Sequence, residues 1–272
     1  MTQLTFTSHP FLAAYVTCGD PNLAASKDII LSAIAAGADV VELGVPFSDP
    51  VADGPVIQRA SERALANRTT LSDVLRLAGE VRKAEGRAGL VIFSYYNPVL
   101  RYGLDRFCDD ARAAGVDGAL ITDLTVEEAG DYIAAMRKRD LATIFLAAPT
   151  STDARLKAIA AASRGFVYAV SRTGVTGTQQ KLAEDAGLLV RRIKKFTKLP
   201  VAVGFGISNS EQFQAAGKFA DGVVVGSAIV QTIEKNAASG RAAQAVGEFI
   251  RGLKKHSAQQ KQSALSPQHL TK

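Results

Sequence analysis

The segment ADVVELGVPFSDPVADGP, residues 38–55, contains the pattern from which the fold of the chain can be predicted. Its first six residues form a short, β-branched apolar run that is followed at once by Gly and Pro, which is typical of a buried strand. Glu42 lies at the end of this strand, and a Pro-rich loop leads into a helical pattern that begins at Val56. The segment therefore predicts one strand–loop–helix unit.

The same unit recurs along the 272-residue chain. Apolar runs that predict strands cover residues 11–16, 40–43, 90–93, 118–121, 143–147, 165–170, 201–204 and 222–225. Helical patterns cover residues 23–36, 56–65, 71–84, 104–114, 126–139, 154–162, 183–196, 210–219, 228–234 and 242–254. Because each run is apolar on both faces, the alternation predicts a parallel sheet covered by helices.

A similar phrase precedes several of the strand runs, as AGAD at 36–39, AGVDG at 114–118 and FADG at 219–222. Eight repeated units favour a closed barrel over an open doubly wound sheet, and the residues after the first run form no dinucleotide-binding fingerprint. We predict an α/β protein with a single-domain (β/α)8 TIM barrel over residues 1–255. Residues 256–272 are polar and lack periodicity, and they predict a disordered, basic C-terminal tail.

Composition narrows the classes of function. With 47% hydrophobic and 21% charged residues the chain is typical of a globular protein. Neither a signal peptide nor an apolar segment of membrane-spanning length is found, so we expect a cytoplasmic protein without a membrane partner. The net charge of +6 is spread over the helices, which argues against nucleic-acid binding. Cys18 and Cys108 have no metal or disulfide spacing, and we expect buried free thiols.

Elimination leaves carboxylates and tyrosines as the acid–base groups. The histidines lie near the termini, and no strand run contains a lysine, which disfavours a His-based triad, a His metal site and a Schiff base. The candidates at strand ends are Glu42, Asp53, Asp123, Tyr95, Tyr96 and Tyr168. A carboxylate in an apolar strand requires compensation, which catalysis explains, but Glu42 as a structural acceptor and Asp53 as a turn residue remain open.

Two glycine-containing loops, 204–208 and 226–228, follow the last two predicted strands. In such barrels these loops hold phosphate through backbone amides at helix N-termini, although helix capping alone also explains the glycines. The loop SRTGVTGT at 171–178 contains two Gly and four hydroxyl residues. This composition predicts a mobile lid, and an ordinary flexible connection is the alternative.

Five motifs together match a known family. They are ELGVPFSDPVADGP at 42–55, SYYNPVLRYG at 94–103, VSRTGVTG at 170–177, GFGIS at 204–208 and VGSAIV at 225–230. Through them the chain resembles the α subunit of tryptophan synthase over positions 9–254. The resemblance implies a lyase that cleaves indole-3-glycerol phosphate by a retro-aldol step, releasing indole and glyceraldehyde 3-phosphate, with neither metal nor organic cofactor.

The resemblance also implies roles for individual residues. Glu42 matches the family's general acid–base, and Asp53 matches the carboxylate that accepts the indole N–H. The implied phosphate-binding residues are Gly177, Gly204, Phe205, Gly206, Gly226 and Ser227. The positions that match the indole pocket are Tyr15, Phe93, Tyr95, Leu120 and Tyr168, and Thr176 in the lid is expected to reach Asp53 on closure.

A partner follows from the same resemblance. In the family, a PLP-dependent β subunit joins the α subunit as an αββα tetramer and receives indole through a tunnel. Thr125 stands where the family usually has Pro, in a loop expected near the partner. Alternatives are a stand-alone indole-releasing lyase, another phosphate-sugar barrel enzyme and a non-catalytic regulatory barrel. The presence of both Glu42 and Asp53 disfavours the last of these.

Overall fold

The computed structural model describes residues 4, 6, 8–170, 179–204 and 206–264. Its parallel strands alternate with helices, as the sequence predicts. The strands are β1 (Phe11–Thr17), β2 (Val40–Gly44), β3 (Gly89–Ser94), β4 (Gly118–Ile121), β5 (Ala142–Ile144), β6 (Leu146–Ala147), β7 (Val167–Val170), β8 (Val201–Gly204) and β9 (Gly222–Val225). All of their pairings are parallel.

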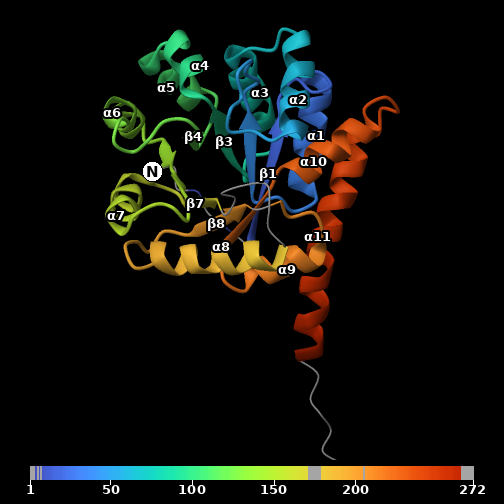
Figure 1. Ribbon diagram of the computed structural model, residues 1–272. Helices are drawn as coiled ribbons and strands as arrows, with labels where there is room; N and C mark the ends of the chain where they lie inside the picture. Colours follow the sequence, from blue (N-terminus) through green and yellow to red (C-terminus); the bar gives the residue numbers. More distant parts are fainter. Residues whose placement is uncertain (1–3, 5, 7, 171–178, 205, 265–272) are drawn as a thin grey trace, which may run out of the picture.

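Helices cover the outside of the strands (Figure 1). They are α1 (Leu23–Ala35), α2 (Pro55–Ala66), α3 (Leu71–Ala84), α4 (Tyr96–Tyr102), α5 (Leu104–Ala113), α6 (Gly130–Lys138), α7 (Asp153–Ala162), α8 (Gln179–Ile193), α9 (Ser210–Gly217), α10 (Ser227–Asn236) and α11 (Ala242–Ala264). None of the described helices combines the length and apolar character needed to cross a membrane.

Two helices differ from the sequence prediction. Helix α4 was not predicted, because it is short and its Pro98 reads as a helix breaker, yet proline is tolerated in the first turn of a helix. Helix α11 continues to Ala264, past position 255, where we expected the barrel to end and a disordered tail to begin. In Figure 1 this helix, coloured orange to red, projects beyond the barrel.

The sheet closes at the fifth predicted strand, residues 143–147. The strand order is β5-β4-β3-β2-β1-β9-β8-β7-β6, so the two outermost strands are consecutive in the chain and are separated by Phe145 alone. Phe145 is buried outside the ring against Tyr132 of α6, with ring centroids 6.4 Å apart. Its carbonyl oxygen still accepts a hydrogen bond from the Tyr168 amide at 3.1 Å. The predicted (β/α)8 barrel is therefore confirmed, with its fifth strand in two parts.

Side chains alternate between the inside of the barrel and the helix layer. Along β1, Leu12, Ala14 and Val16 belong to the large apolar cluster shared with the helices, whereas Phe11 and Ala13 belong to a smaller cluster inside the ring. This alternation is the period of two expected of a strand. Because Glu42 follows Val40 at the same spacing, its carboxyl group faces the interior above the apolar filling.

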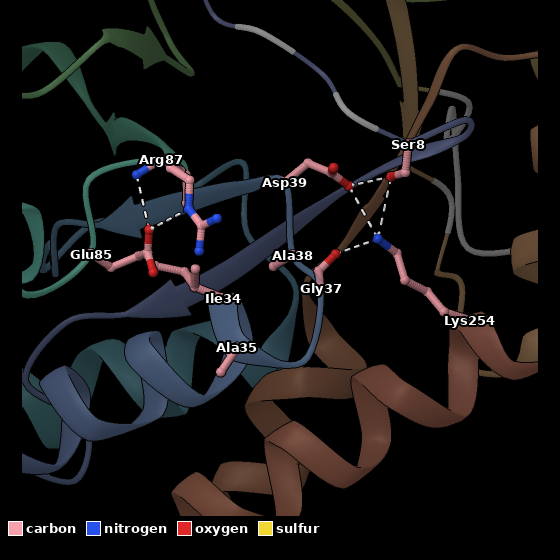
Figure 2. Close-up of a pocket in the computed structure, with 10 residues that line it drawn as sticks. Ser8, Ile34, Ala35, Gly37, Ala38, Asp39, Glu85, Arg87 and Lys254 are labelled. Carbon is pink, nitrogen blue, oxygen red and sulfur yellow. Dashed lines mark hydrogen bonds and ion pairs between the residues drawn. The ribbon is translucent and has the colours of Figure 1, made fainter.

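The repeated Asp of the AGAD-like phrase fastens neighbouring strands at their N-terminal ends. The Asp39 amide donates to the Leu12 carbonyl at 2.9 Å, and its Oδ2 accepts from the Leu12 amide at 2.9 Å. Figure 2 shows Asp39 facing Ser8 and Lys254, whose Nζ lies 3.2 Å from Oδ2. The same two bonds join Asp117 to Leu90 and Asp221 to Val201, with Arg82 and Lys194 as the respective cations. The repeated Asp therefore has a structural role at the N-terminal ends of the strands.

Candidate active site

Glu42 is a buried carboxyl group inside the barrel, and it lies two residues before the end of β2 and not at the strand end as predicted. It lies on β2 in register with Tyr15 on β1 and Val91 on β3, and its exposed fraction is 0%. Neither of its carboxyl oxygens has a hydrogen-bond partner among the described residues, so a purely structural role as an acceptor finds no support there. Burial raises the pKa of Glu42 to about 8. The group is therefore protonated at neutral pH and able to donate a proton.

Asp53 occupies the loop between β2 and α2 and is held by Tyr95. Its Oδ2 accepts a hydrogen bond from the Tyr95 hydroxyl at 3.1 Å, and the same hydroxyl accepts from the Ala52 amide at 2.9 Å. Burial raises the pKa of Asp53 to about 6, while the hydrogen bond from Tyr95 opposes this rise. Asp53 is therefore ionised at neutral pH. The two predicted catalytic carboxyl groups differ in protonation state because their environments differ.

The hydroxyl groups of Tyr15 and Tyr168 interact electrostatically with both Glu42 and Asp53. Burial raises the pKa of Tyr15 and of Tyr168 well above the usual value, and the charges of both Glu42 and Asp53 add to each rise. Both hydroxyls stay protonated and can donate hydrogen bonds. Tyr15 lies in register with Glu42, and the Tyr15 and Tyr168 hydroxyls lie beside Gly44 and Gly204, the last residues of β2 and β8.

Aromatic rings and the aliphatic side chain of Leu120 line the site. The rings of Tyr15 and Phe93 contact edge to face at 5.0 Å between centroids. Leu120 is fully buried in the cluster inside the barrel, which Phe93 and Tyr168 also contact. A Cβ atom at Gly44 would collide with the Tyr15 ring, so glycine at this position makes room for the ring. Four of the predicted indole-pocket residues, Tyr15, Phe93, Leu120 and Tyr168, therefore line one apolar region. The fifth, Tyr95, packs against Phe47 with ring centroids 5.0 Å apart.

The predicted phosphate site lies at the start of α10. Gly226 precedes this helix and Ser227 is its first residue, and no side chain caps its N-terminus. Helix α9 differs, because Asn209 Oδ1 accepts a hydrogen bond from the Gln212 amide at 2.9 Å. Gly206 has a φ of +84° and open space beside its Cα. Uncapped amides at a helix N-terminus attract anions, so α10 is the better placed of the two helices to bind phosphate.

Some predicted residues have other roles or lie outside the described part of the chain. The Asp123 carboxylate accepts a hydrogen bond from the Tyr96 amide at 2.7 Å, which caps the start of α4. Cys18 and Cys108 are free and buried, as predicted. Outside the described residues lie Thr176, Gly177 and Phe205, together with the rest of the predicted lid, residues 171–178.

Thr17 lies beside the candidate site and was not among the residues predicted from the sequence. Its side chain is buried, and its Oγ1 donates a hydrogen bond to the Tyr15 hydroxyl at 3.3 Å. The available signal was its spacing, because residues two apart on a strand face the same side. Within the described residues, no group of three or more His, Cys, Asp or Glu side chains is placed to hold a metal ion.

Comparison with known proteins gives a consistent match over most of the chain. The sequence model of a family described as "Tryptophan synthase alpha chain" matches residues 1–259. A tryptophan synthase alpha chain from Solibacter usitatus is 51% identical over 244 residues, covering 90% of this chain and 91% of the relative. The crystal structure of tryptophan synthase subunit alpha from Legionella pneumophila has a TM-score of 0.84 at 36% identity, covering 92% and 93% of the two chains. A tryptophan synthase structure from M. tuberculosis has a TM-score of 0.81 at 38% identity, covering 90% and 93%.

Proposed function

The chain belongs to the tryptophan synthase alpha chain family, and from this premise we propose how its residues carry out the family's reaction. The activity is the alpha reaction of tryptophan synthase, a lyase reaction that cleaves indole-3-glycerol phosphate into indole and glyceraldehyde 3-phosphate. The bond that breaks joins C3 of the indole ring to the hydroxyl-bearing carbon of the glycerol chain. A proton must reach C3, and the hydroxyl must lose one as it becomes a carbonyl.

We propose that Glu42 carries both proton transfers. As a buried carboxylic acid with a pKa of about 8, it holds a proton at neutral pH and can deliver it to indole C3. The resulting carboxylate then accepts the proton of the glycerol hydroxyl. The electrons of the O–H bond form the carbonyl, and those of the breaking C–C bond restore the indole ring. Glu42 ends the cycle protonated, so no other proton source is required.

The proposed role of Asp53 is electrostatic. Protonation at C3 interrupts the aromatic system and places positive charge on the indole nitrogen. An ionised carboxylate that accepts the indole N–H stabilises this charge more in the transition state than in the ground state. Tyr95 supports the role because its hydroxyl holds both the carboxylate and the neighbouring Ala52 amide.

The proposed phosphate site is the start of α10 with the glycines of the neighbouring loop. Support comes from the uncapped amides at Gly226 and Ser227 and from the open space beside Gly206. The full proposed set is Gly177, Gly204, Phe205, Gly206, Gly226 and Ser227. We keep Thr176 as the lid residue that reaches Asp53 when substrate is bound.

The family implies a β subunit as partner, and we propose an αββα assembly in the cytoplasm. Two exposed apolar side chains near the barrel mouth support docking there. Val51 is 86% exposed in the loop that carries Asp53, and Leu100 is 52% exposed on α4, which directly follows Tyr95. Because the Tyr95 hydroxyl binds the Ala52 amide, the two elements are linked beside the site.

The observation that carries the proposal is the buried Glu42 carboxyl group without a described hydrogen-bond partner. The test is indole release by Glu42→Gln, measured with and without the β subunit and beside a thermal melt. We expect turnover to fall on the order of 100- to 10,000-fold in a folded protein. Wild-type turnover in folded Glu42→Gln would exclude the role, and equal wild-type turnover with and without the β subunit would favour a stand-alone lyase.

A further inference from the structure

One arginine, Arg63, joins the loop after β1, helix α2 and helix α10. Its neighbour on α2, Arg59, also donates two hydrogen bonds to Glu234 of α10, at 3.1 and 3.2 Å. On α2, Arg63 donates from Nε to Oδ1 of Asp20 at 2.8 Å and from Nη2 to Oδ2 at 2.9 Å. Its Nη1 donates to Oε1 of Glu234, on α10, at 2.9 Å. Because the N–H groups of a guanidinium are fixed in one plane, this arginine holds the two carboxylates in defined directions.

The Asp20 carboxylate of the Arg63–Asp20 pair is shielded from solvent. The Asp20 side chain is 2% exposed and that of Arg63 is 34% exposed. A buried carboxylate needs a partner that satisfies its oxygens, and the two N–H groups of Arg63 supply one each. The Asn67 side chain, directly after α2, also donates to the Gly19 carbonyl at 3.1 Å. The C-terminal end of α2 is therefore fastened to the β1 loop more firmly than an exposed ion pair would fasten it.

Two of the elements that Arg63 joins, α2 and α10, begin beside the proposed catalytic and phosphate-binding residues. Helix α2 begins at Pro55, two residues after Asp53, and α10 begins at Ser227 in the proposed phosphate site. Strands β2, β1 and β9, which precede the joined elements, are neighbours in the sheet. In Figure 1, α2 and α10 lie on the same side of the barrel, and the two helices contact each other.

An apolar cluster joins the same two helices near the site. Ile57 and Ala60 of α2 pack with Val230 of α10 around Tyr15. The helix pair is thus held at its site end by apolar packing and at its far end by the contacts of Arg63 and Arg59 with Glu234.

We propose that Arg63 is a positioning residue, which through Asp20 and Glu234 sets the placement of the α10 phosphate site relative to Asp53. This inference rests on the proposed roles of Asp53, Gly226 and Ser227. The substrate carries its phosphate and its indole at two ends of one molecule, so both sites must be correctly spaced for the indole nitrogen to meet Asp53. A misplacement of about 1 Å is sufficient to reduce turnover on the order of 100-fold.

The test breaks the contacts of Arg63 and Arg59 to α10 while leaving the buried Arg63–Asp20 pair intact. Arg59→Ala removes only the contact from Arg59, and it should leave kcat near the wild-type value. In Glu234→Ala, Asp20 keeps both bonds from Arg63, and the 32% exposed Glu234 side chain is replaced without leaving a buried charge. With the full chain and its β subunit, we expect kcat for indole-3-glycerol phosphate to fall about tenfold. Binding of glyceraldehyde 3-phosphate, which occupies the phosphate site alone, should stay within about twofold of wild type.

Two further variants separate positioning from general stability. Glu234→Gln retains an oxygen that accepts from Arg63, so it should recover most of the lost kcat. Glu80→Ala is the matched control, because it breaks the exposed Lys27–Glu80 pair between α1 and α3, and it should leave kcat unchanged. A merely stabilising contact would lower the Tm of Glu234→Ala without lowering kcat at temperatures where the variant is folded.

Two results would overturn the inference. One is wild-type kcat in folded Glu234→Ala, and the other is a loss of glyceraldehyde 3-phosphate affinity as large as the loss of kcat, which would mean that the phosphate site itself is damaged. Failure of the proposed function is recognised separately. If Glu42→Gln lost its activity while Glu234→Ala kept wild-type kcat, only the role of Arg63 would be rejected.

Discussion

The Tyr95 hydroxyl donates a hydrogen bond to Oδ2 of Asp53 at 3.1 Å, which links the end of β3 to the loop after β2. Because this bond favours the ionised carboxylate, its loss in Tyr95→Phe should raise the pKa of Asp53 and lower kcat about tenfold. The measurement is kcat/KM against pH, in which the acidic limb should move to higher pH. Tyr102→Phe is the control, since that hydroxyl binds Asp110 instead. An unmoved acidic limb in Tyr95→Phe would contradict the role.

The pKa values of the two carboxyl groups predict a bell-shaped pH dependence. Asp53 must be ionised, so kcat/KM should rise as pH increases through about 6, and Glu42 must be protonated, so it should fall as pH increases through about 8. Asp53→Asn should retain little activity, and the pH profile of the activity that remains should lack the acidic limb. A wild-type profile that stayed flat from about pH 5 to 9 would show that neither group titrates in the rate-determining step.

The raised pKa of Glu42 should also make the free energy of unfolding fall as pH rises toward 8. Its pKa is about 8 in the folded protein and about 4.3 in an unfolded chain. Between these values the folded protein holds a proton that the unfolded chain has lost, so stability is greatest at low pH and declines as pH rises toward 8. Glu42→Gln has no charge to bury, and its free energy of unfolding should exceed that of wild type at pH 8 by on the order of a few kcal/mol. Denaturant unfolding at pH 5 and pH 8 measures this difference, which should shrink to about 1 kcal/mol at the lower pH if the sign is correct.

Two substitutions of Gly226 test the phosphate site, with Gly226→Ala as the control for Gly226→Asp. A Cβ atom at this position would make ordinary contacts, the nearest with Tyr15 Cβ at 3.6 Å, so Gly226→Ala should fold and bind substrate. Gly226→Asp places a negative charge beside the uncapped amides of α10, and we expect KM to rise at least about 100-fold. Calorimetric titration with glyceraldehyde 3-phosphate should show the same loss. Equal affinity of the Asp and Ala variants would place the phosphate elsewhere.

Thr176 provides the prediction for the lid. In Thr176→Val the shape of the side chain is kept but its hydroxyl is removed, so Asp53 should lose an orienting partner when substrate is bound. We expect kcat to fall about tenfold and activation by the β subunit to weaken, with an unchanged Tm. Protease cleavage between Arg172 and Lys181 in the presence of a substrate analogue reports closure. Equal turnover and equal ligand-induced protection in Thr176→Val and wild type would exclude the coupling.

The strands could be predicted from the sequence because buried parallel strands are continuous apolar runs. Glu42 was identifiable for the same reason, as a charged residue inside such a run. The interruption at Phe145 could not be read, because residues 143–147 are uniformly suitable for a strand and the outward packing of Phe145 depends on Tyr132. Local patterns do not report which distant side chain fills a given space.

Only some of the polar contacts of the site could be predicted from the sequence. The family resemblance placed Tyr95 and Asp53 at one site, but not the hydrogen bond between them. Arg63 reaches Asp20 across 43 residues and Glu234 across 171 residues, and each of these residues by itself reads as an ordinary charge in a loop or on a helix. The AGAD-like phrase was visible as a repeat, whereas the pairing of its Asp with the preceding strand appears only in three dimensions.

The interruption of the fifth strand at Phe145 leaves β5 paired as a strand only with β4, and β6 only with β7. On the other side of β5, single backbone hydrogen bonds remain from Arg164 to Thr143 and from Tyr168 to Phe145. Strands β1 and β9, in contrast, have a partner on each side. Transient opening of a barrel begins where a strand has the fewest inter-strand bonds, since the free energy of local opening follows the local hydrogen bonding. In deuterium-uptake measurements, the amides around Phe145 should therefore exchange well before those of β1, and solvent would first enter the barrel interior from that side.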